Sequence, residues 1–318
     1  MRRGLTPLAT DPSAAVRLAR EAYFARREPG DDPSEHSAAF ETRLLSGRAP
    51  GLLWSGPGGP IGLVLWGEPS PLGAVVRVLH LDLPEASATE YGRFLGALES
   101  EGARIAFLSG GLAGLSSEDE EGLLRAHGFA KYGRSELEFP AGRSVPGHDP
   151  PTGIRLRSLR PDDLPRVARV HRAAYSGRFD EYLFLRDPDP ERDAALLFED
   201  LRNGRWGELL PQDSTVAEDS GRPVGATVVI GTDPGALIAD VVTDPAYGGR
   251  GIGAAMLSAT LSALRAEGQA PIRLAVTEGN RRARRLYERI GFVVHAGPTE
   301  EWYRTDLVPV GPEDGPLP

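Results

Sequence analysis

Cysteine is absent from this 318-residue sequence. Disulfides, thiolate metal sites and a covalent cysteine intermediate are therefore excluded, and we expect no metal centre. Long apolar runs are also absent, because no stretch approaches the roughly 18 residues of a membrane-spanning helix, and no signal-like segment follows the arginines near the N-terminus. These absences predict a cytoplasmic protein that does not associate with membranes.

An excess of positive charge is lacking as well, since 36 lysine and arginine residues face 45 aspartate and glutamate residues, for a net charge of -9. This balance argues against binding to nucleic acid and slightly favours neutral or cationic partners. Apolar residues, in contrast, make up 40% of the chain. That fraction and the length are sufficient for two domains, each with its own hydrophobic core.

The chain divides near its middle. The stretch PAGRSVPGHDPPTG, residues 140–153, holds four prolines and three glycines and little to bury, which is typical of a linker. We therefore expect a first domain over 1–140, a linker over 141–151 and a second domain over 152–309. The tail 310–318 has no apolar periodicity, and we expect it to be disordered.

The two halves resemble each other in sequence. Equivalent positions occur in the same order at nearly the same spacing: Leu5 and Leu156, Leu8 and Leu159, Asp11 and Asp162, and Val16 and Val167. Near the ends of the halves, LLRAHGF (123–129) aligns with LYERIGF (286–292). We interpret this as a tandem duplication. Chance similarity between two α/β segments is the alternative.

The pattern of the second half predicts strands alternating with helices. The predicted strands are 154–159, 214–219, 222–231, 236–243, 272–277, 292–297 and 300–308. Four helices are predicted. The first begins near Pro161, the second covers 194–204, the third runs from about Leu257 to Gly268, and the fourth covers 283–290 with Asn280 as its cap. A mixed α/β sheet with helices between its strands follows.

A glycine-rich turn stands between a β-branched strand and a helix in VVTDPAYGGRGIGAAM, residues 241–256. A helix N-terminus carries unpaired N–H groups and partial positive charge, so this position suits a phosphate or a pyrophosphate. Gly251 and Gly253 would let an oxygen approach the backbone. A simple turn into the helix is the alternative. The loop lacks G-K-[ST] and the spacing of G-x-G-x-x-G, which excludes two familiar phosphate motifs.

Two segments in this half resemble the GNAT superfamily of N-acetyltransferases. TDPAYGGRGIG matches the family pattern [QR]-x-x-G-x-[GA], with Gly251 and Gly253 on the glycine positions and Gly248 where the family usually has Gln or Arg. VTEGNRRARRLYERIGF, residues 276–292, matches N-x-x-A-x-x-x-Y-x-x-x-G-F throughout. The resemblance implies two tandem GNAT domains, each a mixed, mostly antiparallel twisted sheet flanked by helices.

The resemblance also implies an acetyl-CoA site. Backbone groups of Val241 and Thr243 are expected to pair with the pantetheine arm, an N–H near Val242 is expected to meet the oxyanion, and Asn280 is expected to contact the pantetheine. The pyrophosphate is expected within the residues that follow the strand: Gly249, Arg250, Gly251, Ile252, Gly253 and Ala254. Asn280 and Tyr287 are seven residues apart and so share one helix face, roughly 10 Å apart along the axis.

The expected reaction needs an acid and a base. Tyr287, which would otherwise be an ordinary core residue, is predicted to protonate the departing thiolate. Asp240, the carboxylate inside the apolar strand, is predicted to be the base. The alternative is that Asp240 is only a salt-bridged acid of the strand, and Glu278 is a second candidate for the base.

Arginines 281, 282, 284 and 285 either meet the 3'-phosphate of CoA or form a solvent-exposed helix face. His171 and His295 receive no role.

The first half lacks the matching residues. Leu124 aligns with Tyr287, Ser117 aligns with Asn280, and PEASA (84–88) replaces the glycine loop. Because a glutamate would repel phosphate, we expect this half to be a degenerate GNAT-like domain without a cofactor site.

The sequence therefore predicts a tandem N-acetyltransferase that uses acetyl-CoA and acts on a primary amine, with a small molecule as the favoured acceptor. A protein N-terminal or lysine acetyltransferase and a non-enzymatic acyl-CoA-binding module are the alternatives. The segment 175–193, which is acidic and aromatic, is expected to form the wall of the acceptor pocket and to favour a cationic acceptor. Self-association as a homodimer stays open.

Overall fold

The computed structural model describes residues 4–25, 44–45, 51–66, 71–81, 87–109, 112, 114–204 and 207–309. These residues form two compact units. Unit 1 comprises the described residues up to Tyr132 together with Glu300–Pro309, and unit 2 comprises those of Gly133–Thr299. The predicted tail 310–318 and residues 84–86 of the PEASA segment lie outside the described residues.

Each unit includes a strand segment from the other half of the sequence. Residues 134–139 of the first half pair with a strand of unit 2, and residues 301–303 near the end of the chain pair with a strand of unit 1. The linker predicted over 141–151 belongs to unit 2, and its Val145 packs against the core of that unit. The units are thus not simply the first and second halves of the chain.

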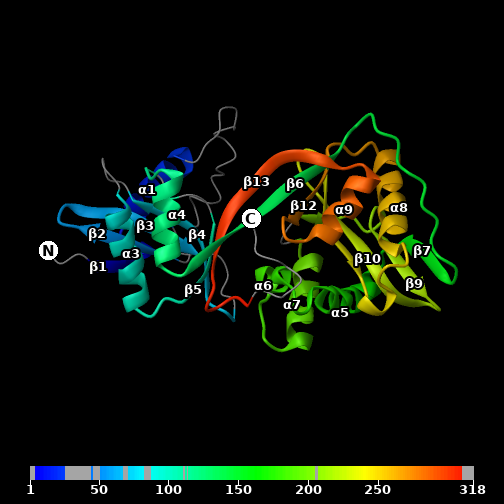
Figure 1. The fold of residues 1–318 in the computed structure, drawn as a ribbon, viewed down its shortest axis with the longest axis horizontal. Coiled ribbons are helices and arrows are strands. Elements are labelled where there is room, and N and C mark those ends of the chain that lie inside the picture. Colours follow the sequence, from blue (N-terminus) through cyan, green and yellow to red (C-terminus); the bar gives the residue numbers. More distant parts are fainter. Residues whose placement is uncertain are drawn as a thin grey trace. The chain divides into compact units, whose positions relative to one another are not determined.

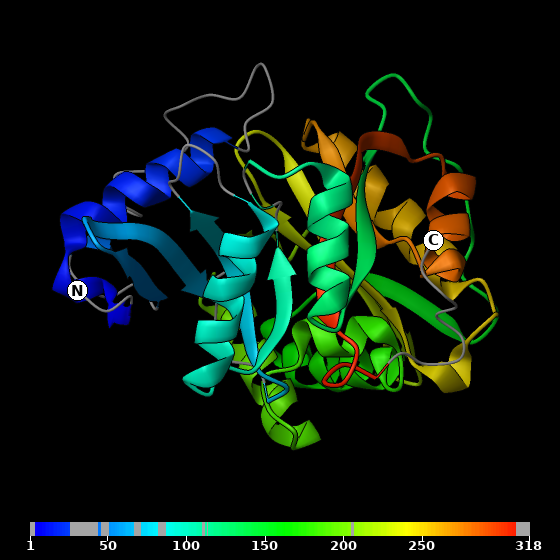
Figure 2. The same ribbon diagram turned by 60° about the vertical axis from the view of Figure 1, so that its left-hand side comes forward.

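Unit 1 is a sheet with helices on both faces. Its elements are β1 (Gly4–Pro7), α1 (Pro12–Ala25), β2 (Gly51–Gly56), β3 (Gly59–Trp66), β4 (Ala74–Leu81), α3 (Ala88–Ser100), β5 (Ile105–Ser109) and α4 (Ser117–Ala126). Alternate residues of β2 point to opposite faces, so Leu53 packs with α1 while Trp54 packs with α3. Helices α3 and α4 lie side by side (Figure 2).

Unit 2 repeats this order of elements. Its strands are the end of β6 (Phe129–Phe139), β7 (Ile154–Ser158), β8 (Glu208–Leu209), β9 (Thr215–Asp219), β10 (Arg222–Gly231), β11 (Ala236–Thr243), β12 (Ile272–Thr277) and the start of β13 (Val293–Arg304). Its helices are α5 (Leu164–Tyr175), α6 (Phe179–Phe184), α7 (Pro190–Arg202), α8 (Ile252–Ala266) and α9 (Arg281–Ile290). The strand order is β6-β12-β11-β10-β9-β7, and within it only β11 and β12 are parallel. The predicted fold class, a mixed and mostly antiparallel sheet flanked by helices, is confirmed (Figure 1).

Most elements predicted in the second half match the structure closely. The hairpin between β9 and β10 turns through Ser220 and Gly221, both at positive φ, as the dipeptide indicates. Two differences stand out. The strands predicted on either side of Gly297 are one continuous β13, because pairing with neighbouring strands outweighs the local preference of Gly-Pro for a turn. The short helix α6 lies inside a segment for which no helix was predicted.

Strands β11 and β12 diverge. Their parallel pairing covers only Ala236 with Ile272 and Leu237 with Arg273. Beyond that point β11 continues beside β10, and β12 continues beside β6. A register shift against β10 leaves Ala239 unpaired, which is a β-bulge and changes the face on which the following side chains lie. The divergence opens a gap between the two strands in the middle of the sheet.

A buried ion cluster stabilises the start of unit 2. Glu218 on β9 accepts hydrogen bonds from Arg155 Nε and Arg157 Nε, each at 2.7 Å, and Arg157 also binds Asp163 through both terminal nitrogens at 2.6 and 2.7 Å. Burial alone would raise the pKa of Glu218 and of Asp163, but the hydrogen bonds from the arginines dominate and lower both pKa values. The cluster ties β7, β9 and the entry to α5 together.

We expect Glu218→Ala to destabilise unit 2 by about 3 kcal/mol, because the largely buried guanidinium of Arg157 loses one of its two carboxylate partners. Urea unfolding measures this loss. The matched control is Glu191→Ala, which breaks an exposed pair with Arg169 and should cost less than about 1 kcal/mol. Since the folded pKa of Glu218 lies below its unfolded value, the stabilisation is complete above the unfolded pKa of about 4.3 and disappears as the pH falls further. Equal losses in the two variants, or a loss independent of pH, would contradict this interpretation.

Candidate active site

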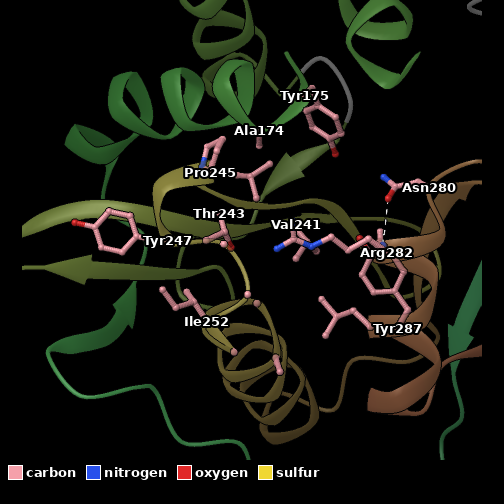
Figure 3. Close-up of a pocket in the computed structure, with 18 of the residues that line it drawn as sticks. Ala174, Tyr175, Val241, Thr243, Pro245, Tyr247, Ile252, Asn280, Arg282 and Tyr287 are labelled. Carbon is pink, nitrogen blue, oxygen red and sulfur yellow. Dashed lines mark hydrogen bonds between the residues drawn. The ribbon is translucent and has the colours of Figure 1, made fainter. Parts of the chain in front are cut away.

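A pocket of about 380 Å³ lies where β11 and β12 diverge. All of its lining residues belong to unit 2 (Figure 3). They come from the end of α5 and the segment after it, from the end of β11, from the glycine loop with the first turn of α8, and from α9. The pocket therefore brings together both sequence segments that resemble the GNAT patterns.

The glycine loop forms the N-terminus of α8 and one end of the pocket. Gly249 and Gly251 have φ values of +77° and +85°, a conformation that favours glycine. A Cβ atom at Gly251 would meet no other atom within 4 Å, so the space above this backbone is open. With the unpaired N–H groups of the first turn of α8 beside it, the loop can accept an anion.

Gly253 has a structural role in addition to the one predicted. A Cβ atom there would lie 3.2 Å from Leu286 Cδ2, so this glycine lets α8 approach α9 closely. Arg250 does not line the pocket, and its guanidinium lies over the ring of Tyr247, 5.3 Å from the centroid. Among the residues predicted for the pyrophosphate, Gly249, Gly251 and the residues 252–254 line the pocket.

The backbone of β11 presents two peptide groups to the gap. The N–H of Asp244 donates to the carbonyl of Val224 on β10 at 2.8 Å. Because backbone groups alternate along a strand, those of Val242 also face β10, and those of Val241 and Thr243 face away from it. The alternation directs the groups of Val241 and Thr243 toward the gap. The N–H of Val242, the residue near which an oxyanion-binding N–H was predicted, points toward β10 instead.

The arginines at the start of α9 fall into two groups. Arg284 pairs with Glu278 and Glu288. Arg282 reaches instead toward β11, and its Nη2 would lie 3.3 Å from a Cβ atom at Gly248 (Figure 3). Among the described residues, Arg282 forms no hydrogen bond or ion pair. Its guanidinium thus lies where the side chain of the family's usual Gln or Arg at position 248 would begin.

We expect Arg282→Ala to weaken the binding of acetyl-CoA. An exposed charge pair contributes up to about 1 kcal/mol, which corresponds to about a fivefold rise in Kd. Isothermal titration at low salt measures the change, and the effect should shrink as salt is added. Arg285→Ala is the matched control, because Arg285 is exposed on the same helix and does not line the pocket. Equal effects of the two substitutions would show that Arg282 contributes only through the general positive field.

Asn280 holds two elements in place. Its Oδ1 accepts from the N–H of Ala283, which confirms the predicted cap of α9, and its Nδ2 donates to Asp180 on α6 at 3.0 Å. Asp180 is buried and also accepts from the hydroxyl of Thr277 at the end of β12. One amide N–H of Asn280 is left for a ligand. The carboxylate of Asp180 therefore fixes α6 beside the pocket, a role that its sequence position did not indicate.

Two tyrosines enter the pocket from different helices. Tyr287 comes from α9 and Tyr175 from α5 (Figure 3). Burial, followed by the negative charges of Asp240 and Asp180, raises the pKa of Tyr287 well above its usual value. The pKa of Tyr175 is raised in the same way, with burial as the main cause. Both phenols are therefore protonated at neutral pH and can act as proton donors.

Asp240 is bonded to α5. Its Oδ2 lies 2.7 Å from Nδ1 of His171, and its Oδ1 accepts from the hydroxyl of Tyr175 at 3.2 Å. The alternative base Glu278 is instead bonded to Ser135 and Arg284. Asp240 thus has the closer connection to the pocket, through Tyr175. His171, which received no role from the sequence, is its direct partner.

In unit 1, a core side chain takes the position that aligns with Tyr287. Leu124, which aligns with Tyr287, is fully buried in a core that includes Leu112, Phe129 and Trp302. An aliphatic side chain offers no proton and no hydrogen bond.

In the part of the chain that the structure describes, no helix is long and apolar enough to span a membrane.

Comparisons with known sequences agree with the motifs. A model of the family described as "Acetyltransferase (GNAT) family" matches residues 173–292. A mycothiol acetyltransferase of Propionibacterium freudenreichii is 31% identical over 51% of this chain and 49% of its own length, and one of Thermomonospora curvata is 29% identical over 90% and 92%. A probable N-acetyltransferase of Mycobacterium tuberculosis is 30% identical over 48% of this chain and 86% of its own length. In the first of these matches, the chain spans about half the length of the relative.

Solved structures show the same fold. A GCN5-related N-acetyltransferase from Sphaerobacter thermophilus superposes with a TM-score of 0.64 at 17% identity, over 97% of this chain and 96% of that one. A tandem GNAT protein from the clavulanic acid biosynthesis pathway superposes with a TM-score of 0.57 at 18% identity, over 95% and 97%. The whole chain, and not only its second half, therefore has this architecture.

Proposed function

Because the chain belongs to the GNAT family of acetyltransferases, we propose that it transfers an acetyl group from acetyl-CoA to a primary amine of a small molecule. The pocket between the diverging strands β11 and β12 carries this proposal. It has a helix N-terminus at one end, suited to a pyrophosphate, and an exposed strand backbone beside it, suited to an amide-containing arm. Acetyl-CoA has both groups.

The binding roles follow from the geometry of the pocket. Gly249 and residues 251–254 surround the pyrophosphate with backbone N–H groups, and Arg282 adds a positive charge beside them. The peptide groups of Val241 and Thr243 continue the hydrogen bonding of the sheet to the pantetheine amides. Asn280 donates its remaining amide N–H to the same arm.

The amine nitrogen attacks the thioester carbonyl carbon, and the carbon–sulfur bond then breaks. A cleft-facing N–H, that of Val241 in place of Val242, stabilises the oxyanion. Tyr287 donates its proton to the departing thiolate, and recovers one from the nitrogen of the new amide. Its hydroxyl forms no hydrogen bond among the described residues, so the proton is available. Asp240 is the base of the reaction.

The acceptor is proposed to be a small cationic amine. Asp180 holds α6 beside the pocket, and Tyr175 and Arg178 of the acidic and aromatic segment line it. Several relatives are named mycothiol acetyltransferases. The acetyl-free form of mycothiol is therefore the first acceptor to test. A peptide with a free N-terminus represents the alternative of a protein acetyltransferase.

The test offers acetyl-CoA and one amine at a time to the whole chain: the acetyl-free form of mycothiol, glucosamine, or the peptide. Mass spectrometry detects the acetylated amine for every acceptor. With glucosamine and the peptide, a thiol reagent also detects released CoA without interference from the protein, which has no cysteine. Acetylation of a small amine supports the proposal. Acetylation of the peptide alone favours a protein acetyltransferase, and binding of acetyl-CoA without any transfer favours an acyl-CoA-binding module.

A further inference from the structure

A chain of hydrogen bonds leads from the pocket into the layer between α5 and β11. Tyr175 lines the pocket and donates to Asp240, whose other carboxylate oxygen lies 2.7 Å from Nδ1 of His171. The side chains of His171 and Asp240 are only 12% and 13% exposed. The proton on Nδ1 is therefore directed at the carboxylate.

The local structure explains why these groups meet. His171 and Tyr175 are four residues apart on α5 and share one face of the helix, with ring centroids 4.6 Å apart. The bulge at Ala239 puts Asp240 on the same face of the sheet as Val242, which packs against α5. The side chains of Val241 and the next alternate residue, Thr243, line the pocket instead.

The two tyrosines of the pocket have different surroundings. The hydroxyl of Tyr175 is bonded to a carboxylate, whereas that of Tyr287 has no hydrogen-bond partner among the residues described. A phenol that already gives its proton to Asp240 is poorly placed to give it to a thiolate. It is well placed to pass a proton toward that carboxylate. The geometry assigns the acid role to Tyr287 and the base side of the reaction to Tyr175.

We propose that Tyr175 and Asp240, positioned by His171, form a proton relay that deprotonates the acceptor, an inference that rests on the proposed acetyl transfer. The ammonium acceptor gives a proton to the oxygen of Tyr175 while Tyr175 gives its own to Asp240. The proton stays on Oδ1 of Asp240, while the Nδ1–H of His171 remains hydrogen-bonded to Oδ2 and holds the carboxyl group in place. The free amine then attacks the thioester. Asp240 releases its proton to solvent through Tyr175 after the transfer, so the net reaction yields the amide, CoA and one proton.

The charged and titratable groups around the relay come from four elements. Asp240 lies on β11, Asp180 on α6, Tyr287 on α9 and Arg178 in the turn between α5 and α6. The two carboxylates attract an ammonium acceptor to the pocket. The relay therefore matters only for an acceptor that arrives protonated.

The test compares two amines of similar size near neutral pH. Ethylamine is an ammonium ion there, whereas the fluorines of 2,2,2-trifluoroethylamine leave its amine neutral. In the whole chain, Tyr175→Phe and His171→Asn should lower kcat/KM for ethylamine by about 100-fold, a typical contribution of general-base catalysis. The rates with trifluoroethylamine should stay within about threefold of wild type, and the defect with ethylamine should shrink as the pH rises toward the pKa of the amine.

The matched control is His295→Asn, because His295 also lies beside a carboxylate, 3.3 Å from Glu138, but outside the pocket. It should leave both rates unchanged. Equal losses with both amines in Tyr175→Phe and His171→Asn would mean that these groups only support the structure, and would overturn the relay. If the wild-type chain acetylates neither amine, acetyl transfer itself is contradicted, and the relay with it. If the wild-type chain acetylates both amines and the two variants do so at the wild-type rates, only the relay is contradicted.

Discussion

Gly251→Glu should abolish the binding of acetyl-CoA while the chain stays folded. Gly251 precedes the first turn of α8, and the space above it is open. A carboxylate in that space would face the pyrophosphate. Two like charges a few ångström apart repel by several kcal/mol at the effective dielectric of a protein surface, so we expect Kd to rise by about 100-fold or more. Isothermal titration of acetyl-CoA measures the change.

The control for this substitution is Gly268→Glu. Gly268 follows the other end of α8 and has a φ of +73°, close to that of Gly251, and a Cβ atom there would also meet no other atom within 4 Å. The backbone strain and the added charge are therefore matched, and only the position differs. Unaltered binding in Gly251→Glu, or equal loss in the two variants, would show that the glycine loop is only a turn.

Tyr287→Phe should lower kcat by about 100-fold or more while the Kd for acetyl-CoA changes little. The substitution removes the proton that the leaving thiolate needs and keeps the ring that packs against Phe292. Because the hydroxyl has no hydrogen-bond partner among the described residues, its removal should not destabilise unit 2. Steady-state kinetics with a small amine and titration with acetyl-CoA separate the two effects.

Tyr303→Phe is the matched control, since it removes a phenol hydroxyl from unit 1. It should leave kcat unchanged. A rise in KM at constant kcat in Tyr287→Phe would mean that the hydroxyl of Tyr287 stabilises the bound substrate and the transition state equally, and that it does not transfer a proton. Full activity of Tyr287→Phe would remove the general acid from the mechanism.

Local sequence patterns predicted the elements around the pocket well. The β-branched run 236–243 forms β11 with the predicted bounds, and Asn280 caps α9 as expected. These patterns are strong because neighbours in sequence determine them: alternation or β-branching for a strand, a side-chain oxygen for a cap. The glycine loop was also recognisable, because positive φ angles at Gly249 and Gly251 need glycine.

The partners of Asp240 could not be predicted from the same patterns. His171 lies 69 residues before Asp240, and the spacing of His171 and Tyr175 is equally typical of a structural helix face. Only the bulge at Ala239 brings the carboxylate to α5, and a single alanine in an apolar strand gives no sign of a bulge. Asp180 was missed for a similar reason, since its two partners follow it by about a hundred residues.

The composition of the two units was also beyond local patterns. Gly297 and Pro298 indicate a turn, yet β13 runs through them and pairs with β5 at Glu301–Tyr303. The proline-rich linker suggested a boundary near residue 140, whereas residues 134–139 pair with β12 inside unit 2. Strand pairing between distant segments decides both cases, and its energy depends on neighbours that the local sequence does not specify.

The most direct test of the account is the stoichiometry of acetyl-CoA binding to the whole chain. Isothermal titration should give one site per chain, because the pocket of unit 2 has the glycine loop and Tyr287, while Leu124 takes the equivalent position in unit 1. Binding of two molecules per chain would contradict a single active unit. Absence of binding would contradict the proposed function and leave the glycine loop as a turn into α8.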